Sequence, residues 1–317
     1  MSAREPSAVV TAPDISVVVP VLDDPEGIDR TVASLHLQTL PTSRFEVLVV
    51  DNGSRDRTRA AAVAIAAAGP ATVEVLVEDR VRTSYGARNA GIDAARGWLV
   101  CFLDADETVP PDHLERVLSA VEREGLDYAG CPVEIVVDRP TVAACHNRLF
   151  GFPVADYLAS GWVPTCCLTV RRSVIDRIGP FDAALTSGGD AEFGRRAAEA
   201  GVRQGLIVTT AVSHPARGSV AALTRKTRRT ARGKRQLAAR DPRHRHVVRG
   251  YASWERLRPL APWWVRAQLA AAGLPSGWRH TLGVVALKSW LDVVRLGTVV
   301  TDAVGERVGP RRRGLVD

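Results

Sequence analysis

The stretch Trp98-Leu99-Val100-Cys101-Phe102-Leu103-Asp104-Ala105-Asp106-Glu107 decides the fold of this chain. Six apolar residues in a row, with β-branched and aromatic members, predict a buried strand, and an acidic cluster follows it directly. Open α/β sheets bind ligands at the carboxyl ends of their strands, so these carboxylates are expected at a ligand site. Because side chains alternate along a strand, Asp104 and Asp106 are predicted to point the same way. They would then share one hard divalent cation with the phosphate oxygens of a substrate.

An isolated Asp-X-Asp motif is weak evidence for such a site. Acidic residues after a strand most often form a solvated turn or cap the next helix. The prediction therefore depends on the segments around this motif.

Apolar runs alternate with helical patterns over the first hundred residues. Strands are expected at 15–20, 45–50, 73–77 and 98–103, with helices at 25–38, 58–68 and 84–96. This order predicts an α/β fold with a Rossmann-like, mostly parallel sheet flanked by helices and joined by right-handed crossovers. The polar residues that end the strands at one rim are Asp23 and Asp24, Asp51, and Asp104 with Asp106. No glycine-rich dinucleotide or P-loop motif follows the first strand, so phosphates are expected to be held through a metal.

The second half of the chain gives a more broken pattern. A helix to 124, a strand over 127–137, a strand at 168–172 with a helix to 178, a helix from Asp190 to about 201, and a strand at 206–212 are expected. Residues 139–163 contain Pro140, Pro153 and Trp162, and they are predicted to form an irregular segment beside a cleft.

Composition and charge divide the chain in two. From Arg217 onward there are 22 Lys and Arg against 6 Asp and Glu, whereas the preceding residues carry 20 against 29. The acidic part is interpreted as catalytic and the basic part as a docking surface for something anionic. The five cysteines include no CxxC pair, which favours a reduced, cytoplasmic setting.

Six short motifs follow one another between residues 15 and 214. They are Val18-Val19-Pro20-Val21, Val49-Val50-Asp51-Asn52-Gly53-Ser54, Ala87-Arg88-Asn89-Ala90-Gly91-Ile92, Phe102-Leu103-Asp104-Ala105-Asp106, Val170-Arg171-Arg172 with Gly179-Pro180-Phe181-Asp182, and Gly189-Asp190-Ala191-Glu192-Phe193. Their order and spacing resemble the family 2 glycosyltransferases, inverting enzymes of the GT-A fold that use nucleotide-activated sugars. The resemblance covers about two thirds of the chain.

The resemblance implies a donor-binding set at the ends of the first strands. Its members are Pro20, Asp23 (or Asp24), Asp51, Arg88 and Asp104. In the family the acidic residues of the first two loops hold the base and ribose, the arginine lies near the diphosphate, and the first Asp of the Asp-X-Asp motif lies near the ribose. The family more often has Tyr-Asn where this chain has Leu22-Asp23. The alternative for Arg88 is an exposed helix arginine.

The resemblance also implies a metal site and a base. Asp106 would be the direct ligand of Mn²⁺ or Mg²⁺ and His214 a further one, although a histidine after a strand is more often a polar loop residue. Asp190 would take the proton of the acceptor hydroxyl, and its alternative role is a helix N-cap. Trp162, Gly189 and Glu192 are placed on the acceptor side. Gly189 stands where the family usually has an acidic residue.

Two cysteines, Cys166 and Cys167, stand where relatives often have Gly-Asn. No histidine or base motif accompanies them, so they are interpreted as packing residues on the acceptor side.

The C-terminal part lies outside the resemblance. Residues 225–249 carry eleven basic residues against Asp241 alone, yet no zinc finger, RRM signature or aromatic pattern accompanies them, so nucleic acid is not the expected partner. In 282–300 the polar residues Lys288, Asp292 and Arg295 fall on one narrow helical stripe. Charge within that run argues against a membrane span, and a helix lying at an anionic membrane surface fits better. The alternative is that these helices pack on the catalytic domain or form a dimer contact.

Three parts are predicted: a flexible arm at 1–14, a catalytic domain at 15–216 with its nucleotide-sugar half ending near 107, and a basic, Trp-containing helical region at 217–317. The arm lacks the apolar core of a secretory signal. We expect a cytoplasmic, metal-dependent inverting glycosyltransferase, peripheral at the inner face of the cell membrane. It would move a sugar from a nucleotide-diphosphate donor, with UDP the expected nucleotide, to a hydroxyl of a lipid-linked or cell-envelope glycan precursor.

Two other functions are weighed against this one. A sugar nucleotidyltransferase would need a glycine-rich loop with a basic partner after the first strand, and none is present. A non-catalytic scaffold or nucleic-acid-binding protein would be marked by loss of the acidic residues, but Asp104, Asp106 and Asp190 are all retained.

Overall fold

The computed structural model describes residues 12–241, 243 and 257–307, with side chains described to residue 301. Most of the arm predicted at 1–14, part of the basic run after Asp241, and Trp254 lie outside these residues. The chain divides into two compact units. The first comprises Met1–Val133, Val154–Ala183 and Phe193–Val212, and the second Glu134–Pro153, Ala184–Glu192 and Ser213–Asp317.

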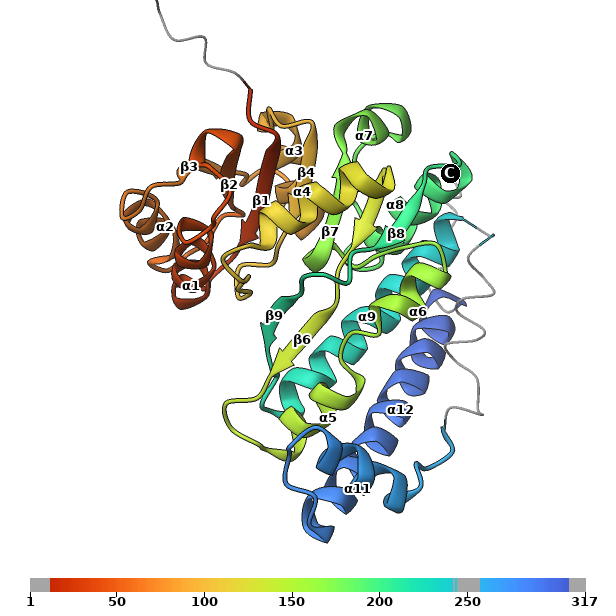
Figure 1. Ribbon diagram of the computed structural model, residues 1–317. Helices are drawn as coiled ribbons and strands as arrows, with labels where there is room; N and C mark the ends of the chain where they lie inside the picture. The colour runs from red at the N-terminus through yellow and green to blue at the C-terminus, as the bar shows by residue number, and fades with distance from the viewer. Residues whose placement is uncertain (1–11, 242, 244–256, 308–317) are drawn as a thin grey trace, which may run out of the picture. The chain divides into compact units, whose positions relative to one another are not determined.

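A seven-stranded sheet organises the first unit (Figure 1). In spatial order it contains β3 (Thr72–Val77), β2 (Phe45–Asp51), β1 (Ile15–Val21), β4 (Leu99–Phe102), β7 (Leu168–Arg171), β5 (Tyr128–Gly130) and β8 (Gln204–Leu206). All neighbouring pairs are parallel except β4–β7 and β5–β7. The predicted mostly parallel sheet is confirmed, with β7 as an antiparallel insertion.

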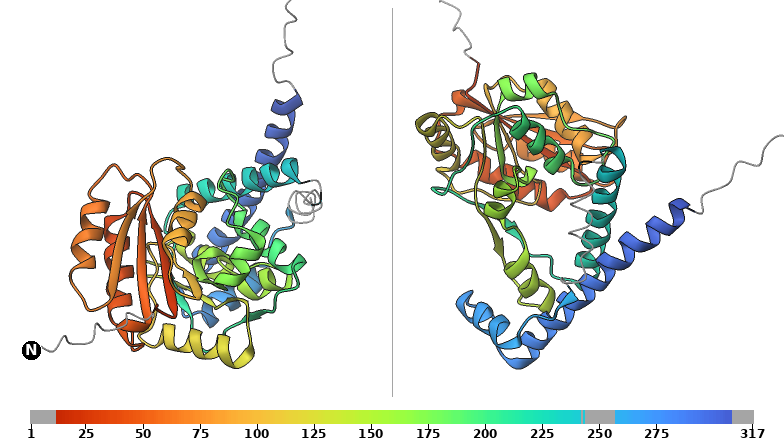
Figure 2. Two further views of the ribbon diagram at one scale, coloured as in Figure 1. Left: turned by 90° about the horizontal axis from the view of Figure 1, so that it is seen from above. Right: turned by 90° about the vertical axis from the view of Figure 1, so that its right-hand side faces the viewer.

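Helices flank this sheet (Figures 1 and 2). They are α1 (Pro25–His36), α2 (Thr58–Ala66), α3 (Ser84–Ala94), α4 (His113–Glu124), α6 (Val154–Ala159) and α7 (Arg172–Ile178), with short 3₁₀ turns η1 (Thr42–Arg44) and η2 (Thr165–Cys167). Every residue of β2 and β4 is buried, as continuous apolar runs predict for strands covered on both faces.

Asp14, the last residue of the predicted N-terminal arm, contacts the first unit. Asp14 is fixed by an ion pair with Arg44 (2.6 Å) and by a hydrogen bond from the Trp98 indole (3.0 Å). Both partners lie beside the sheet, so the ordered domain begins before Ile15.

The predictions for 127–163 were wrong in two respects. The strand expected over 127–137 is two strands, β5 and β6 (Val133–Val136), with the proline Pro132 between them. The irregular segment contains two helices, α6 and α5 (Val142–Phe150), and the Thr141 hydroxyl caps α5 by accepting from the Ala144 N–H. Pro140 and Pro153 lie just before helix starts, where proline is tolerated, and do not indicate a loop throughout.

The strand expected at 206–212 is also divided. β8 ends at Leu206 and β9 runs Val212–Pro215, pairing with β6 in a two-stranded sheet. His214 therefore lies within a strand and not in the loop after one.

The second unit is helical apart from β6 and β9. Its long helices are α9 (Val220–Arg240), α11 (Pro262–Ala271) and α12 (Trp278–Arg307), and α8 (Gly189–Glu199) begins in it. Helices α5, α9, α11 and α12 share two apolar clusters, which contain Ala143, Leu223, Leu287 and Leu291, and Cys145, Val265, Leu269 and Val284. Within the described residues, no helix has the length and hydropathy needed to cross a bilayer.

Candidate active site

The carboxyl ends of β2, β1 and β4 lie next to one another, because Val21 pairs with Asp51 and the Leu103 N–H donates to the Val18 carbonyl. Asp51 ends β2 with its side chain fully buried. Its carboxylate accepts from the Ser54 N–H and from Arg59 Nε, both at 3.0 Å. The predicted juxtaposition of the acidic loops is thus present.

The loop after β1 is tied to the loop after β2. Ser54 Oγ accepts from the Asp23 N–H (3.0 Å), and Asp23 Oδ1 accepts from the Arg55 N–H (2.8 Å). Asp23 has a left-handed backbone, with φ 50°. Asp24 instead caps α1 by accepting from the Gly27 N–H, so of the two acidic residues Asp23 is the one left at the rim. Pro20 lies half-buried near the end of β1.

A fourth acidic residue, Glu78, follows β3 and was missed by the sequence analysis. Its carboxylate accepts from the N–H groups of Val81 (2.9 Å) and Arg80 (2.8 Å), and these bonds lower its pKa. Glu78 thereby orders the loop that carries Arg82 toward Gly53 in the loop after β2. Its position directly after an apolar run is the sequence signal by which Glu78 could have been found.

The Asp104–Asp106 segment forms a turn after β4 and is not part of the strand. The argument from strand alternation was therefore wrong for this pair. The turn is fixed instead by Glu107, whose Oε2 accepts from the Asp104 N–H (2.7 Å), while the Glu107 N–H donates to the Asp104 carbonyl. Asp106 is partly buried, and the Ala105 carbonyl lies against Gly27 at the start of α1.

Arg88 is buried at the start of α3, so its alternative interpretation as an exposed helix residue was wrong. Its Nη2 pairs with Asp104 Oδ1 at 2.5 Å and its Nη1 donates to the Ser84 carbonyl, while its buried Nε has no hydrogen-bond partner. These two bonds use two of the five guanidinium N–H groups, so further donors remain at the end of β4.

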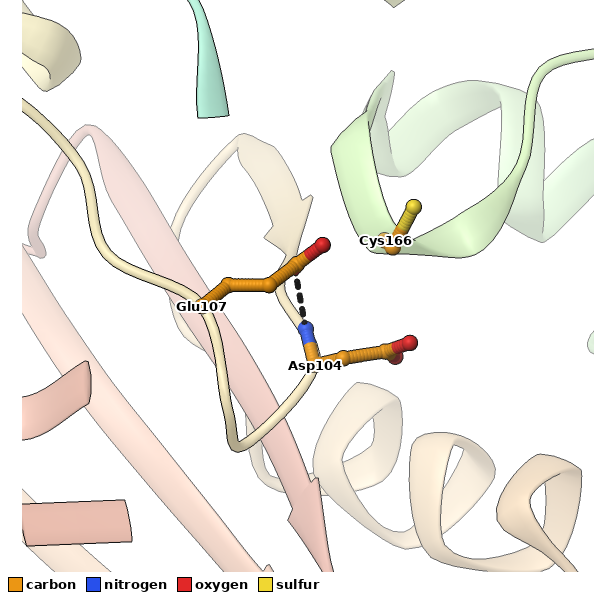
Figure 3. A group of neighbouring side chains, drawn as sticks. All are labelled: Asp104, Glu107 and Cys166. Carbon is orange, nitrogen blue, oxygen red and sulfur yellow. Dashed lines mark hydrogen bonds between the residues drawn. The ribbon is translucent and has the colours of Figure 1, made fainter. Parts of the chain in front are cut away.

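Glu107, Asp104 and Cys166 form a group that the sequence analysis did not foresee (Figure 3). One ligand atom from each lies within 4.8 Å of the others, and Glu107 Oε1 is buried without a hydrogen-bond partner. Burial chiefly, with Cys166 and Asp104 nearby, raises the pKa of Glu107 well above its usual range. Glu107 comes from the turn after β4 and Cys166 from η2, so no local pattern could have connected them. Asp106 is not part of this group.

Two of the six motifs are joined directly in the first unit. The Asn89 amide on α3 donates to the Phe181 carbonyl (2.9 Å) and accepts from the Phe181 N–H (3.0 Å). The Thr83 hydroxyl caps α3 and donates to the Ala183 carbonyl. Phe181 also packs its ring against Tyr85, at 5.7 Å between centroids. These contacts set the start of α3, and with it Arg88.

Asp190 is the second residue of α8, and the N-cap position expected for it was wrong. Helix α8 begins at Gly189, and Asp190 Oδ1 accepts from the next N–H, that of Ala191 (2.9 Å). Gly189, Asp190 and Glu192 belong to the second unit, whereas the β4 turn belongs to the first.

The loop before Asp190 is fastened to α9 by Gln236, a residue that the sequence analysis missed. Gln236 Oε1 accepts from the N–H (3.1 Å) and hydroxyl (3.2 Å) of Thr186, and its Nε2 donates to the Ala184 carbonyl (2.8 Å). Gly233, one turn earlier on α9, lets Ser187 approach closely. Nothing in the sequence around Gln236, a polar residue in a basic helix, indicated that it would hold the loop before Asp190.

His214 is buried in β9, so its alternative as a polar loop residue was wrong. Its Nδ1 lies 2.7 Å from the Pro215 carbonyl oxygen and its ring packs on Phe152 at 5.3 Å. Trp162, in the first unit, stacks on Tyr157 at 4.3 Å and lies close to Gly194.

Comparison with known proteins gives the family. The sequence model of the family described as glycosyl transferase family 2 matches residues 16–177. The model described as glycosyl transferase family group 2 matches residues 99–300. The chain belongs to glycosyltransferase family 2. Glycosyltransferase AglE of Haloferax volcanii is 34% identical over 246 residues, which cover 77% of this chain and 80% of that protein.

Solved structures agree on the fold. A mannosyltransferase from Pyrobaculum calidifontis, PcManGT, in complex with GDP-Man and Mn²⁺, superposes with a TM-score of 0.60 at 21% identity, covering 94% of this chain and 88% of that one. S. aureus TarS 1-349 in complex with UDP gives a TM-score of 0.51 at 20% identity, covering 96% and 94%. The chain is a glycosyltransferase with the predicted GT-A fold.

Proposed function

We propose that this glycosyltransferase transfers a sugar, with inversion, from a nucleotide-diphosphate donor to a hydroxyl acceptor and that the reaction depends on a divalent cation. The observation that carries the proposal is the ion pair between the buried Arg88 and the partly exposed Asp104 at the end of β4, beside the ends of β1 and β2. Asp23, Asp51 and Pro20 are proposed to surround the base and ribose, with Asp104 near the ribose. Arg88 is proposed to direct one of its remaining N–H groups to a diphosphate oxygen.

The residues around the β4 turn suit a divalent cation. Glu107 Oε1 is a buried oxygen without a partner, and it lies with an Asp104 oxygen and the Cys166 sulfur in one group. Asp106, from the same turn, and His214 remain the proposed ligands, with Mn²⁺ or Mg²⁺ as the ion. When bound, the cation would stabilise the negative charge of the departing diphosphate.

Asp190 is proposed as the general base. Inverting transfer requires one carboxylate to take the proton of the acceptor hydroxyl as the oxygen attacks the anomeric carbon. The Gln236 contacts hold the loop before Asp190 against α9. Trp162, Gly189 and Glu192 remain proposed residues of the acceptor side.

UDP is the proposed nucleotide, and TarS, which shares the fold, has been solved with UDP. The proposed acceptor is a lipid-linked or cell-envelope glycan precursor, and the support for it is the basic C-terminal region. A cytoplasmic location is proposed on the same basis, together with the five cysteines, which are all free and buried.

Two variants test the assignment of roles. Asp106→Ala should abolish metal-dependent binding of the donor, because the proposed ligand is lost. Asp190→Asn should leave donor binding within twofold of the wild type while lowering transfer by a factor on the order of 10³, because only proton removal is affected. Equal loss of donor binding in both variants would show that the roles are wrong, and release of pyrophosphate from a sugar phosphate and UTP would indicate a nucleotidyltransferase.

A further inference from the structure

Helix α12 buries charged residues beside apolar ones such as Leu287, while its exposed residues from 282 to 300 are all apolar. Asp292 pairs with the Lys288 ammonium and with Arg295 Nη1 (3.0 Å), and all three side chains lie on the face that packs within the second unit. Asp292 and Arg295 are more than nine-tenths buried. A helix that covers a protein core and faces water normally carries its charged residues on the exposed side.

The outward face is apolar over residues 282–300. From 282 to 300, every exposed residue is apolar: Leu282, Ala286, Trp290, Val293, Gly297 and Val300. We call these six residues the apolar stripe. Their spacing of three and four residues places them on one side of the helix, over about 27 Å at ~1.5 Å per residue. A contiguous exposed apolar face of this kind marks an interaction surface.

A row of arginines runs beside the apolar stripe, on α9. The Trp290 indole donates to Thr224 Oγ1 (3.2 Å) and Arg235 donates to the Val299 carbonyl (3.3 Å), so α9 and α12 lie side by side in the same direction (Figure 1). Arg228 and Arg232 are exposed and follow Thr224 at four-residue spacing, which puts them in that same row.

We propose that the apolar stripe lies in the plane of an anionic lipid bilayer, at the boundary between headgroups and acyl chains, with Arg228 and Arg232 against the lipid phosphates. An apolar face edged by tryptophan and arginine is the pattern of helices that lie at this boundary. A second copy of this chain is a poorer occupant, because a twofold contact through the apolar stripe would bring two arginine rows together. The inference is independent of the donor chemistry.

Vesicle flotation of the full chain tests the inference, with vesicles of phosphatidylcholine alone and of phosphatidylcholine mixed with phosphatidylglycerol. The wild type should bind only the phosphatidylglycerol vesicles and lose affinity as salt is raised. Val293→Glu should weaken binding at least about tenfold, because a charge replaces an inserted side chain. Val63→Glu on α2 is the matched control, since Val63 (56%) and Val293 (57%) are equally exposed, and it should bind like the wild type.

The arginine row is tested in the same assay. Arg228→Gln should weaken binding to phosphatidylglycerol vesicles about fivefold, which is the effect expected of one basic residue near the surface. Metal-dependent UDP binding without vesicles should be the same in Val293→Glu as in the wild type, so a failure of the donor site would be seen separately. Absence of binding to either vesicle, or a dimer in sedimentation velocity that Val293→Glu dissociates, would overturn the proposal.

Discussion

The two units of the molecule use charged and apolar residues in different places. In the first, apolar strands β1, β2 and β4 are buried and carboxylates are gathered where the strands end. In the second, α12 packs Lys288, Asp292 and Arg295 inside among buried apolar residues, and only apolar residues are exposed from 282 to 300. The difference shows that charge in a sequence marks a ligand site in one setting and a packing contact in another. The place of the charged residues in the fold, and not composition, distinguishes them.

The largest expected effect separates two adjacent residues of α12. Asp292→Ala should destabilise the second unit by about 4 kcal/mol, because Lys288 and Arg295 are left buried without their counter-charge. Val293→Ala, one position later on the exposed face, should change the free energy of unfolding by less than about 0.5 kcal/mol. Urea denaturation of both variants measures the difference. If the valine change is the costlier one, the assignment of Asp292 to the packed face of α12 and of Val293 to its exposed face is incorrect.

Each unit also contains a histidine that resists protonation, His113 being buried and His146 partly buried. Burial lowers the pKa of His113 in the first unit and of His146 in the second to about 4. Between about pH 6.5 and 4 the unfolded chain binds more protons than the folded one, so stability falls as pH falls through that window. Each histidine should account for about 3 kcal/mol of this loss.

Chemical denaturation from pH 7 to 4 measures that loss. His113→Gln should flatten the pH dependence of the first unit's transition and leave that of the second unit unchanged. An unaltered slope in the first transition would contradict the account of His113.

A smaller effect is expected at the carboxyl end of β4. Arg88→Gln should weaken UDP binding by about tenfold to a hundredfold, since charge-assisted hydrogen bonds contribute about 1.5–3 kcal/mol each. Arg116→Gln on α4, whose arginine pairs with Asp112, should bind UDP like the wild type. Calorimetric titration of both proteins is the measurement, and equal affinities would remove Arg88 from the donor site.

The smallest effect tests Gln236 as a positioning residue for the Asp190 loop. Gln236→Ala should lower kcat by about threefold to tenfold and leave the KM for the donor unchanged, because three hydrogen bonds to Ala184 and Thr186 are lost. Gln236→Glu, which keeps the acceptor oxygen, should recover part of kcat. Gln268→Ala on α11, an exposed glutamine, is the control. A rise in KM without a change in kcat would contradict this role.

The sheet and its acidic rim could be predicted because their signals are local. Unbroken apolar runs such as Phe45–Asp51 identify buried strands, and parallel strands bring their carboxyl ends together whatever the loops do. The place of Asp51 at the end of β2 could be predicted in this way, whereas Arg88 was singled out through the family resemblance.

The contacts that could not be predicted join residues far apart in the chain. Glu107 meets Cys166 through the packing of η2 on the β4 turn, and Gln236 meets Thr186 through the packing of α9. For α12, the spacing of Lys288, Asp292 and Arg295 correctly predicted that they share one stripe. It did not predict which side faces the protein, because that depends on α5, α9 and α11.

Calorimetric titration of the purified protein with UDP, GDP and TDP, each with and without Mn²⁺, tests the central claim most directly. The account predicts that UDP binds in the presence of Mn²⁺ and that affinity falls sharply without the ion or in Asp106→Ala. Equal UDP binding with and without the metal, or no binding of any of the three nucleotides, would contradict it.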